Sequence, residues 1–266
     1  MRIRLVAIDL DNTLLTHEKE ILPTVADAVH RARAEGVEIV LASGRIQNSV
    51  RRYAEQLGLT GPLICCNGAD AVWADGRVIF HDPLAESAVT RVLEFAARVG
   101  AQANVYTADE VFMVGETEWA AEYRRRVPHL TPEFRSAESI RGFSVSKVLL
   151  IGAADAIPRW RAEIEPTLDA NVVRITESEP EYLEFLGAGV SKGTALERVA
   201  QLLQIPQAET GAIGDYWNDF EMLAWCGYPG AIGNALDSVK SIAKIVVKSN
   251  ENGGVADYLN AILSYR

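Results

Sequence analysis

Residues 4–15 read RLVAIDLDNTLL, and this stretch decides the fold. The apolar run from Leu5 to Ile8 is typical of a strand that is covered on both faces of its sheet. The run ends in two acidic residues, Asp9 and Asp11. Side chains two apart on a strand point the same way, so both carboxylates are expected on one side if the strand continues to Asp11. Two carboxylates that close repel each other unless a positive charge lies between them.

Strand and helix patterns alternate after this stretch. Strands are predicted over 37–42 and 63–66, and helices over 23–35 and 46–57, each helix ended by a glycine. A β-hairpin is predicted over 71–80 around the turn pair Asp75-Gly76. The same rhythm returns near residue 188, with helices over 192–203, 219–226 and 254–263 and strands over 211–215 and 230–232. This alternation predicts an α/β fold whose sheet is mostly parallel, with right-handed crossovers.

The segment between these two parts has its own pattern. Helices are predicted over 86–99, 117–126 and 156–168, and strands over 103–106, 111–114, 144–151, 172–176 and 182–186. The sequence therefore predicts a core of residues 1–81 plus 188–266, with a second α/β domain of residues 82–187 inserted into it. Within the insert, the side chains of Arg124, Arg125 and Arg126 could meet an anionic substrate or form a solvated helix face.

Composition narrows the class of protein. The chain has 266 residues and a formal charge of −10, which argues against a nucleic-acid groove because such grooves need clustered Lys and Arg. No apolar stretch approaches the length of a membrane span. Cys65 and Cys66 are adjacent and Cys226 is alone, so reduced thiols are expected rather than a disulfide framework. We expect a cytoplasmic protein with no nucleic-acid or membrane partner.

A second pair of acidic residues, Asp215 and Asp219, lies near the C-terminal end of another predicted strand. Asp215 follows a predicted strand, at the sheet edge where open α/β folds place ligands, and Asp219 comes four residues later. The pair is equally compatible with an ordinary helix cap. Together with Asp9 and Asp11 it favours a divalent cation, since Mg²⁺ prefers oxygen ligands and commonly bridges to phosphate.

Two further segments are typical of anion binding. Ser43 and Gly44 follow the second strand and enter a helix, which offers a hydroxyl and closely approachable backbone N–H groups. Lys192 begins a helix after Ser191, the expected N-cap, and a lysine there opposes the helix dipole. Each segment alone could be an ordinary turn or a surface lysine. An anion nearby would explain both.

These motifs occur in a familiar order. The segments DLDNTLL (9–15), ASGR (42–45), VSKGTAL (190–196) and GDYWNDFEML (214–223) resemble the four motifs of the haloacid dehalogenase superfamily of phosphotransferases. The large insert and the segment ICCNGAD (64–70) are similar to its Cof-type (IIB) branch. The resemblance implies a Rossmann-like, doubly wound parallel-sheet core with an inserted α/β cap. Asn12 departs from the glycine more usual in this branch, but Asn tolerates unusual backbone angles.

The resemblance also implies a chemistry. Asp9 would attack phosphorus to form an aspartyl-phosphate, and Asp11 would handle protons. The implied ligands of Mg²⁺ are Asp9, the backbone carbonyl of Asp11, Asp215 and, nearby, Asp219. The phosphoryl group would be held by Ser43, Gly44, Lys192, Asn218 and the Leu10 N–H, with Thr13 orienting the loop. The function expected is a Mg²⁺-dependent phosphatase of a small phosphorylated metabolite, such as a sugar phosphate or a phosphorylated cofactor.

Three alternatives stay open from the sequence. A phosphomutase of the same superfamily would return the phosphoryl group to its sugar. A phospho-acceptor signalling module also uses an acidic cluster with Mg²⁺, but its acceptor Asp would end the third strand, where this chain has Cys65-Cys66-Asn67. A protein that only binds would not need every predicted catalytic side chain, and all of them are present.

Overall fold

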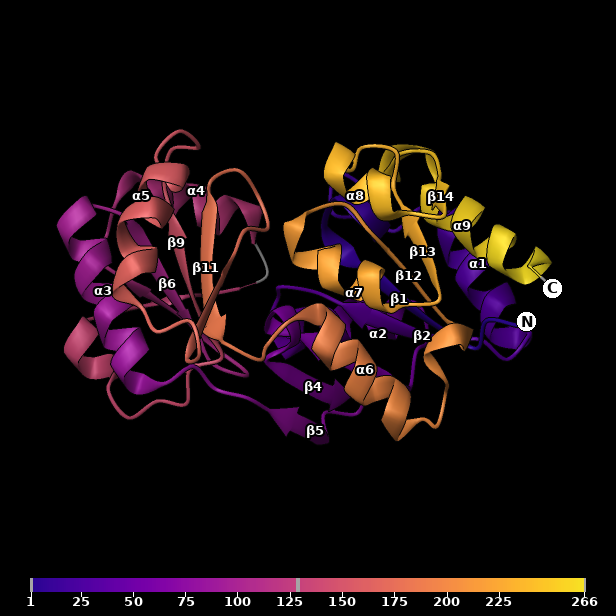
Figure 1. Ribbon diagram of the computed structural model, residues 1–266, viewed down its shortest axis with the longest axis horizontal. Coiled ribbons are helices and arrows are strands. Elements are labelled where there is room, and N and C mark those ends of the chain that lie inside the picture. The colour runs from indigo at the N-terminus through magenta and orange to yellow at the C-terminus, as the bar shows by residue number, and fades with distance from the viewer. Residues whose placement is uncertain (1, 128–129, 266) are drawn as a thin grey trace.

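The computed structural model describes residues 2–127 and 130–265, and these form two lobes (Figure 1). Within these residues, one lobe is built on an eight-stranded sheet in the order β14-β13-β12-β1-β2-β3-β4-β5. The other is built on a six-stranded sheet in the order β10-β11-β9-β6-β7-β8. We call these the core sheet and the inserted sheet, because the strands of the second lie between β5 and β12 in the chain.

The strands of the core sheet are β1 (Leu5–Asp9), β2 (Glu38–Ala42), β3 (Pro62–Cys65), β4 (Asp70–Trp73), β5 (Val78–His81), β12 (Thr210–Gly214), β13 (Tyr228–Ala231) and β14 (Ile245–Val246). Those of the inserted sheet are β6 (Gln102–Tyr106), β7 (Val111–Val114), β8 (Glu133–Arg135), β9 (Lys147–Ile151), β10 (Val173–Thr176) and β11 (Tyr182–Gly187). The helices are α1 (Pro23–Ala34), α2 (Gln47–Gln56), α3 (Glu86–Val99), α4 (Glu118–Arg126), α5 (Ile157–Ile164), α6 (Lys192–Leu202), α7 (Phe220–Trp225), α8 (Asp237–Ile242) and α9 (Gly254–Ser264).

The core sheet is parallel through β14, β13, β12, β1, β2 and β3, and the β4–β5 hairpin continues it in antiparallel fashion. Strand β1 lies between β2 and β12, with Ile8 opposite both Leu41 and Ile213. Because parallel strands end at the same edge, the residues after β1, β2 and β12 converge there. The predicted α/β class with a doubly wound parallel-sheet core is confirmed.

Strand β1 ends at Asp9, and this decides whether Asp9 and Asp11 share a strand face. Residues Leu10–Leu14 form a wide turn in which Asn12 has a φ of 57°, a left-handed conformation that Asn tolerates better than most residues. The condition for a shared strand face, a strand that continues to Asp11, is therefore not met. Asp9 and Asp11 do not share a strand face, and each carboxylate finds its own partners.

The inserted sheet is mostly antiparallel, with one parallel pair between β7 and β8. Its predicted helix over 156–168 is shorter, because Pro166 lies in a separate turn at Glu165–Thr167 after α5 ends. Three short elements, β8, α8 and β14, have no counterpart in the sequence prediction, since runs of two to six residues carry too little periodicity. None of the helices within residues 2–127 and 130–265 combines the length and the apolar character that crossing a membrane requires.

Candidate active site

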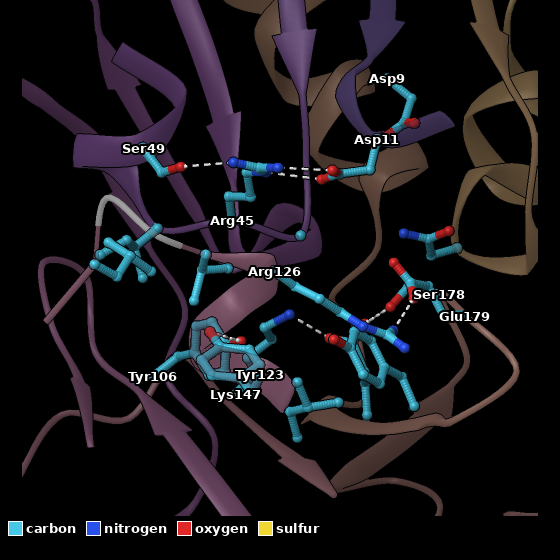
Figure 2. Close-up of a pocket in the computed structure, with 18 of the residues that line it drawn as sticks. Asp9, Asp11, Arg45, Ser49, Tyr106, Tyr123, Arg126, Lys147, Ser178 and Glu179 are labelled. Atoms are coloured by element: carbon cyan, nitrogen blue, oxygen red, sulfur yellow. Dashed lines mark hydrogen bonds and ion pairs between the residues drawn. The ribbon is translucent and has the colours of Figure 1, made fainter. Parts of the chain in front are cut away.

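A cleft with about 780 Å³ of empty space, partly open to solvent, lies between the two lobes. Figure 2 shows Asp9 and Asp11 reaching it from the core lobe, with Tyr106, Tyr123 and Lys147 on the opposite wall. Five of the ten predicted site residues, Asp9, Asp11, Gly44, Asp215 and Asn218, line the core side of this cleft. Its core-side lining includes Asp9, Asp11, Lys19, Gly44, Arg45, Ile46, Ser49, Asp215 and Asn218.

Lys192 connects two carboxylates at the bottom of the site. Its ammonium Nζ donates to Asp9 Oδ1 at 2.5 Å and to Asp219 Oδ1 at 2.6 Å. Burial lowers the pKa of Lys192, but the charges of Asp219 and Asp9 outweigh burial and raise the pKa above its ordinary value. The lysine at the start of α6 therefore stays charged, and its unusual place on the helix is explained by these two anions. Ser191 caps α6 as predicted, by accepting from Thr194 N at 3.0 Å.

The site disfavours ionisation of the Asp9 carboxyl group. Burial and the nearby Asp219 charge raise the pKa of Asp9 to about 7, despite the opposing effect of Lys192. An ordinary exposed Asp would be fully ionised at neutral pH. The site thus holds more negative charge around Asp9 than the single Lys192 neutralises.

Asp219 fixes the loop that follows β12. Its Oδ2 accepts from the backbone N–H of Asp215 at 2.8 Å and of Tyr216 at 3.3 Å, and its side chain is fully buried. It does lie beside Asp215, as predicted, although from a short turn at Trp217–Asp219 rather than from the first turn of α7. Both of its oxygens are engaged, one by Lys192 and one by the backbone.

Three carboxylates lie close enough together to hold a cation. Oxygens of Asp9, Asp215 and Asp219 lie within 4.8 Å of one another in the part of the chain that the structure describes. Burial and the charges of Asp9 and Asp219 raise the pKa of Asp215, so the group is electrostatically unfavourable as it stands. An all-oxygen donor set with excess negative charge fits a hard divalent cation such as Mg²⁺. Thr13 Oγ1 donates to Asp215 Oδ1 at 3.2 Å, which orients this ligand candidate.

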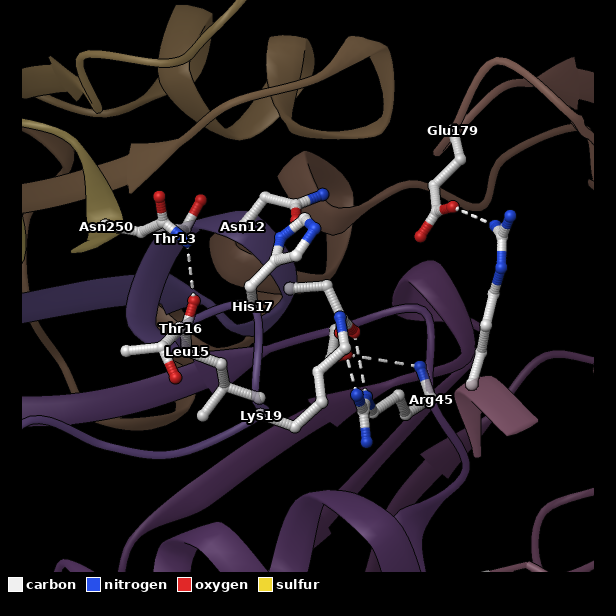
Figure 3. A network of polar contacts seen from close by, with 12 residues as sticks. Asn12, Thr13, Leu15, Thr16, His17, Lys19, Arg45, Glu179 and Asn250 are labelled. Carbon is white, nitrogen blue, oxygen red and sulfur yellow. Dashed lines mark hydrogen bonds and ion pairs between the residues drawn. The ribbon is translucent and has the colours of Figure 1, made fainter. Parts of the chain in front are cut away.

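The Asp11 carboxylate faces two cations. Arg45 donates from Nε and Nη2, and Lys19 Nζ donates at 2.8 Å. Figure 3 shows Lys19 and Arg45 converging there. Burial raises the pKa of Asp11, but the Arg45 and Lys19 charges outweigh burial and hold the pKa well below its ordinary value. Asp11 is therefore a carboxylate in this arrangement.

Two of the predicted phosphate-binding residues, Gly44 and Asn218, line the same side of the cleft, and Ser43 immediately precedes Gly44. Ser43 is buried, and its Oγ accepts from Arg45 N at 3.2 Å, which leaves the hydroxyl proton available to another acceptor. Asn218 Nδ2 donates to Asn67 Oδ1 at 3.0 Å. A Cβ added to Gly44 would lie 3.0 Å from Asn67 Oδ1, so glycine keeps this approach open. Leu10 is buried at the start of the turn after β1, and the turn's far end is tied down where Asn250 Nδ2 donates to Leu15 O at 2.9 Å (Figure 3).

Several cleft residues were not singled out as site residues from the sequence. Arg45 and Asn67 lie inside the segments ASGR (42–45) and ICCNGAD (64–70), so their positions could have identified them as candidate site residues. Nothing in the sequence marks Lys19 as a site residue, because it lies in the irregular segment after the first motif. Lys147 and Glu184, a buried ion pair of the inserted sheet, also line the cleft. Of the three consecutive arginines, Arg126 lines the cleft, whereas Arg124 lies over the Phe134 ring.

Comparison with known proteins places the chain in a family. The model of the haloacid dehalogenase-like hydrolases matches residues 6–259. The protein YxeH of Bacillus subtilis strain 168 is 30% identical over 267 residues, which cover 98% of both chains. The HMP-PP phosphatase of Serratia proteamaculans is 31% identical, covering 96% of this chain and 94% of its own.

A solved structure agrees in fold. The subclass IIB sugar phosphatase BT4131 has a TM-score of 0.88 and covers 97% of this chain and 98% of its own, at 20% identity. The predicted resemblance is therefore confirmed, and so is the prediction of an enzyme of the phosphatase class. This chain belongs to the haloacid dehalogenase-like hydrolases.

Proposed function

We propose that this enzyme is a Mg²⁺-dependent phosphatase that hydrolyses a small phosphorylated metabolite through an aspartyl-phosphate on Asp9. The observation that carries the proposal is the place of Asp9. Asp9 is the last residue of β1 and lines the cleft, and its Oδ1 lies 2.5 Å from the Lys192 Nζ. A nucleophile at that point can reach a phosphoryl group held by the residues around it.

The reaction has two displacements at phosphorus. In the first, a carboxylate oxygen of Asp9 attacks, the bond from phosphorus to the leaving oxygen breaks, and Asp11 gives that oxygen a proton. In the second, water attacks the aspartyl-phosphate, Asp11 accepts a proton from the water, and the Asp9 carboxylate leaves. Acid and base roles alternate on one residue, as they must when the second step follows the first.

Asp11 has to change partners to act in this way. A carboxylate held by Arg45 and Lys19 is a poor proton donor at neutral pH. We infer that an arriving phosphate draws the two cations toward its own charge and so frees Asp11. Arg45 and Lys19 then orient Asp11 for the second step, in which Asp11 acts as a base and must be a carboxylate.

The remaining predicted residues have roles in binding. Asp9 and Asp215, with the Asp11 backbone carbonyl, would hold Mg²⁺, which supplies charge neutralisation around the phosphoryl oxygens. Asp219, whose oxygens are both engaged, would position Lys192 and the Asp215 backbone. The phosphoryl oxygens would be held by Lys192, Ser43, Gly44, Asn218 and the Leu10 N–H, with Thr13 orienting Asp215.

We further propose that residues 82–187 act as the substrate-selecting cap over a core of residues 1–81 plus 188–266. The inserted sheet supplies the wall of the cleft opposite Asp9, where the leaving group of a bound phosphate ester would lie. The relatives named for HMP-PP and for a sugar phosphate support a small metabolite as the substrate. The cytoplasm, where such metabolites occur, is the expected location.

The test is release of inorganic phosphate from a panel of sugar phosphates, nucleotides and phosphorylated cofactors, with Mg²⁺ or with EDTA. We expect release that needs Mg²⁺ and is confined to a few compounds. Asp9→Asn should abolish release while the far-UV circular dichroism spectrum stays unchanged. Full activity in that variant, or full activity in EDTA, would refute the mechanism.

A further inference from the structure

Lys147 and Glu184 form an ion pair in the wall of the cleft that belongs to the inserted sheet. Their side chains are only 3% and 1% exposed. Glu184 Oε2 accepts from Lys147 Nζ and from Asn67 Nδ2, the latter at 2.9 Å, and Glu184 Oε1 accepts from Ser178 Oγ. Through Asn67 the pair is linked to Asn218 on the core side.

The burial of the Lys147–Glu184 ion pair is not explained by fold stability. The desolvation of two charges offsets most of their attraction, so an apolar pair of similar size would stabilise the fold as well or better. The neighbouring side chains on this face, Leu149, Ile151 and Leu186, are buried and apolar. Stability alone therefore does not explain why Lys147 and Glu184 are charged, and their place in the cleft points to a ligand.

The pair stands between two parts of the cleft. On one side, Lys147 Nζ lies 3.4 Å from where a Cβ of Gly44 would be, next to the predicted phosphoryl site. On the other side, it lies 4.4 Å from the centre of the Tyr106 ring. A group attached to a phosphoryl group held near Gly44 would lie next to Lys147 and could extend along the aromatic wall.

This wall is formed by Tyr106, Tyr123, Tyr182 and Leu149. The Tyr106 and Tyr123 hydroxyls bond each other at 2.6 Å, and Arg126, beside the Tyr182 ring, bonds Glu179 at 2.5 Å. A polyol would lose part of its hydration against the tyrosine rings, which offer it few polar partners. A flat ring would keep its few polar atoms near Lys147 and Glu184 and gain contact with the tyrosines.

We propose that the leaving group of the substrate is a flat heteroaromatic ring carrying few hydroxyls, and that Lys147, Glu184 and Tyr106 determine this specificity. Lys147 donates to a ring acceptor and Glu184 accepts from a ring donor, while the ring lies along Tyr106. This inference rests on the proposed phosphatase function and names the substrate class for the same cleft.

The first test compares three phosphate compounds under one set of conditions. Pyridoxine phosphate is a ring ester without an aldehyde that could react with lysines, ribose-5-phosphate is a polyol ester, and acetyl phosphate is too small to reach the wall. We expect kcat/KM for pyridoxine phosphate to exceed that for ribose-5-phosphate by about tenfold or more. Equal values, or a preference for the polyol, would overturn the inference while leaving the phosphatase function in place.

The second test removes the pair. In the double variant Lys147→Met/Glu184→Met, which avoids leaving one buried charge alone, the ratio of kcat/KM for pyridoxine phosphate to that for acetyl phosphate should fall about tenfold, mainly through KM. Tyr106→Leu should lower the same ratio. Arg161→Met, which removes a cation of the same lobe that pairs with Glu177, is the matched control and should leave the ratio unchanged. A purely structural pair would lower turnover of both compounds alike, and that result would contradict the proposal.

Absence of turnover on all three compounds would count against the proposed function, and binding then decides the inference separately. Calorimetry on the Asp9→Asn protein should give a dissociation constant for pyridoxine phosphate about tenfold below that for ribose-5-phosphate. Equal binding of the two would overturn the ring specificity whether or not the enzyme turns over.

Discussion

Arg45 holds the Asp11 carboxylate through two hydrogen bonds, from Nε to Oδ2 at 2.8 Å and from Nη2 to Oδ1 at 2.7 Å. This two-point contact fixes both the direction and the ionisation of the proposed acid–base residue. It also explains how Asp9 and Asp11 can be near neighbours. The Asp9 carboxylate pairs with Lys192, which it shares with Asp219, and the Asp11 carboxylate pairs with Arg45 and Lys19.

Removing this contact should damage turnover more than binding. Arg45→Met is expected to lower kcat by about a hundredfold, because an unoriented Asp11 is a poor base in the second step. Arg45→Lys keeps the positive charge but loses the two-point hydrogen bonding of the guanidinium group. Its kcat should therefore lie between that of Arg45→Met and that of the wild type. Steady-state kinetics with the best substrate of the panel give both values. Lys19→Met removes a single hydrogen bond and should cost less. An Arg45→Met enzyme with wild-type kcat would show that the contact is not needed for catalysis.

Asp219 should matter to the fold as well as to activity. Asp219→Asn turns one acceptor into a donor that faces either Lys192 or the Asp215 N–H, and it leaves a buried lysine with one anion fewer. We expect the free energy of unfolding in urea to fall by about 3 kcal/mol. The control is Asp82→Asn, which breaks the half-exposed pair with Arg198 and should cost less than about 1 kcal/mol. Equal losses in the two variants would contradict the role given to Asp219.

The raised pKa of Asp9 gives the metal-free protein a specific pH dependence. Since the pKa is raised from 3.8 to about 7, the folded state binds a proton that the unfolded state has lost between those values. The stabilisation from protonated Asp9 is fully present below about pH 4 and is lost as the pH rises through about 7. In EDTA, the unfolding free energy of the wild type relative to Asp9→Asn should therefore fall over this range.

Mg²⁺ provides the control for that experiment. A cation held by Asp9 and Asp215 favours the ionised carboxylates, so saturating Mg²⁺ should flatten the wild-type curve and leave Asp9→Asn nearly unaffected. A wild-type curve parallel to that of Asp9→Asn in EDTA would mean that Asp9 is ionised without the metal.

Gly44 should be intolerant of even a methyl group. A Cβ there would meet Asn67 Oδ1 at 3.0 Å and disturb the hydrogen bond that Asn67 accepts from Asn218. Gly44→Ala is expected to lower kcat/KM by about tenfold, because small displacements at a phosphoryl site are costly. Gly189→Ala is the control, since a Cβ at Gly189 meets nothing within 4 Å. Unchanged kinetics in Gly44→Ala would mean that this approach is not used.

The sequence predicted those parts of the fold that depend on local pattern. The alternation of buried strands with glycine-ended helices located β1, β2, β3 and the helices between them, and Ser191 was identified as the cap of α6. Asp9 and Asp215 each lie at or just after the carboxyl end of a strand. Because β1 and β12 are parallel neighbours, their contact follows from the predicted topology alone.

The partners of these residues were beyond a reading of local pattern. The contact of Asp11 with Arg45 spans 34 residues, and that of Lys147 with Glu184 spans 37 residues, so both depend on tertiary packing. The wide turn that follows β1 contains the left-handed conformation of Asn12, which the amino-acid type permits but does not require. Local patterns therefore indicated candidate site residues, and the contacts between their side chains needed the structure.

The central claim is that Asp9 forms a covalent bond with the phosphoryl group, and reduction of the trapped intermediate tests it most directly. The enzyme is mixed with Mg²⁺ and substrate, quenched in acid during turnover, and treated with borohydride, which reduces an acyl phosphate to an alcohol. Peptide mass spectrometry should then find homoserine at position 9, and no reduction without substrate. Reduction at another carboxylate, or no reduction anywhere while phosphate is being released, would contradict the account.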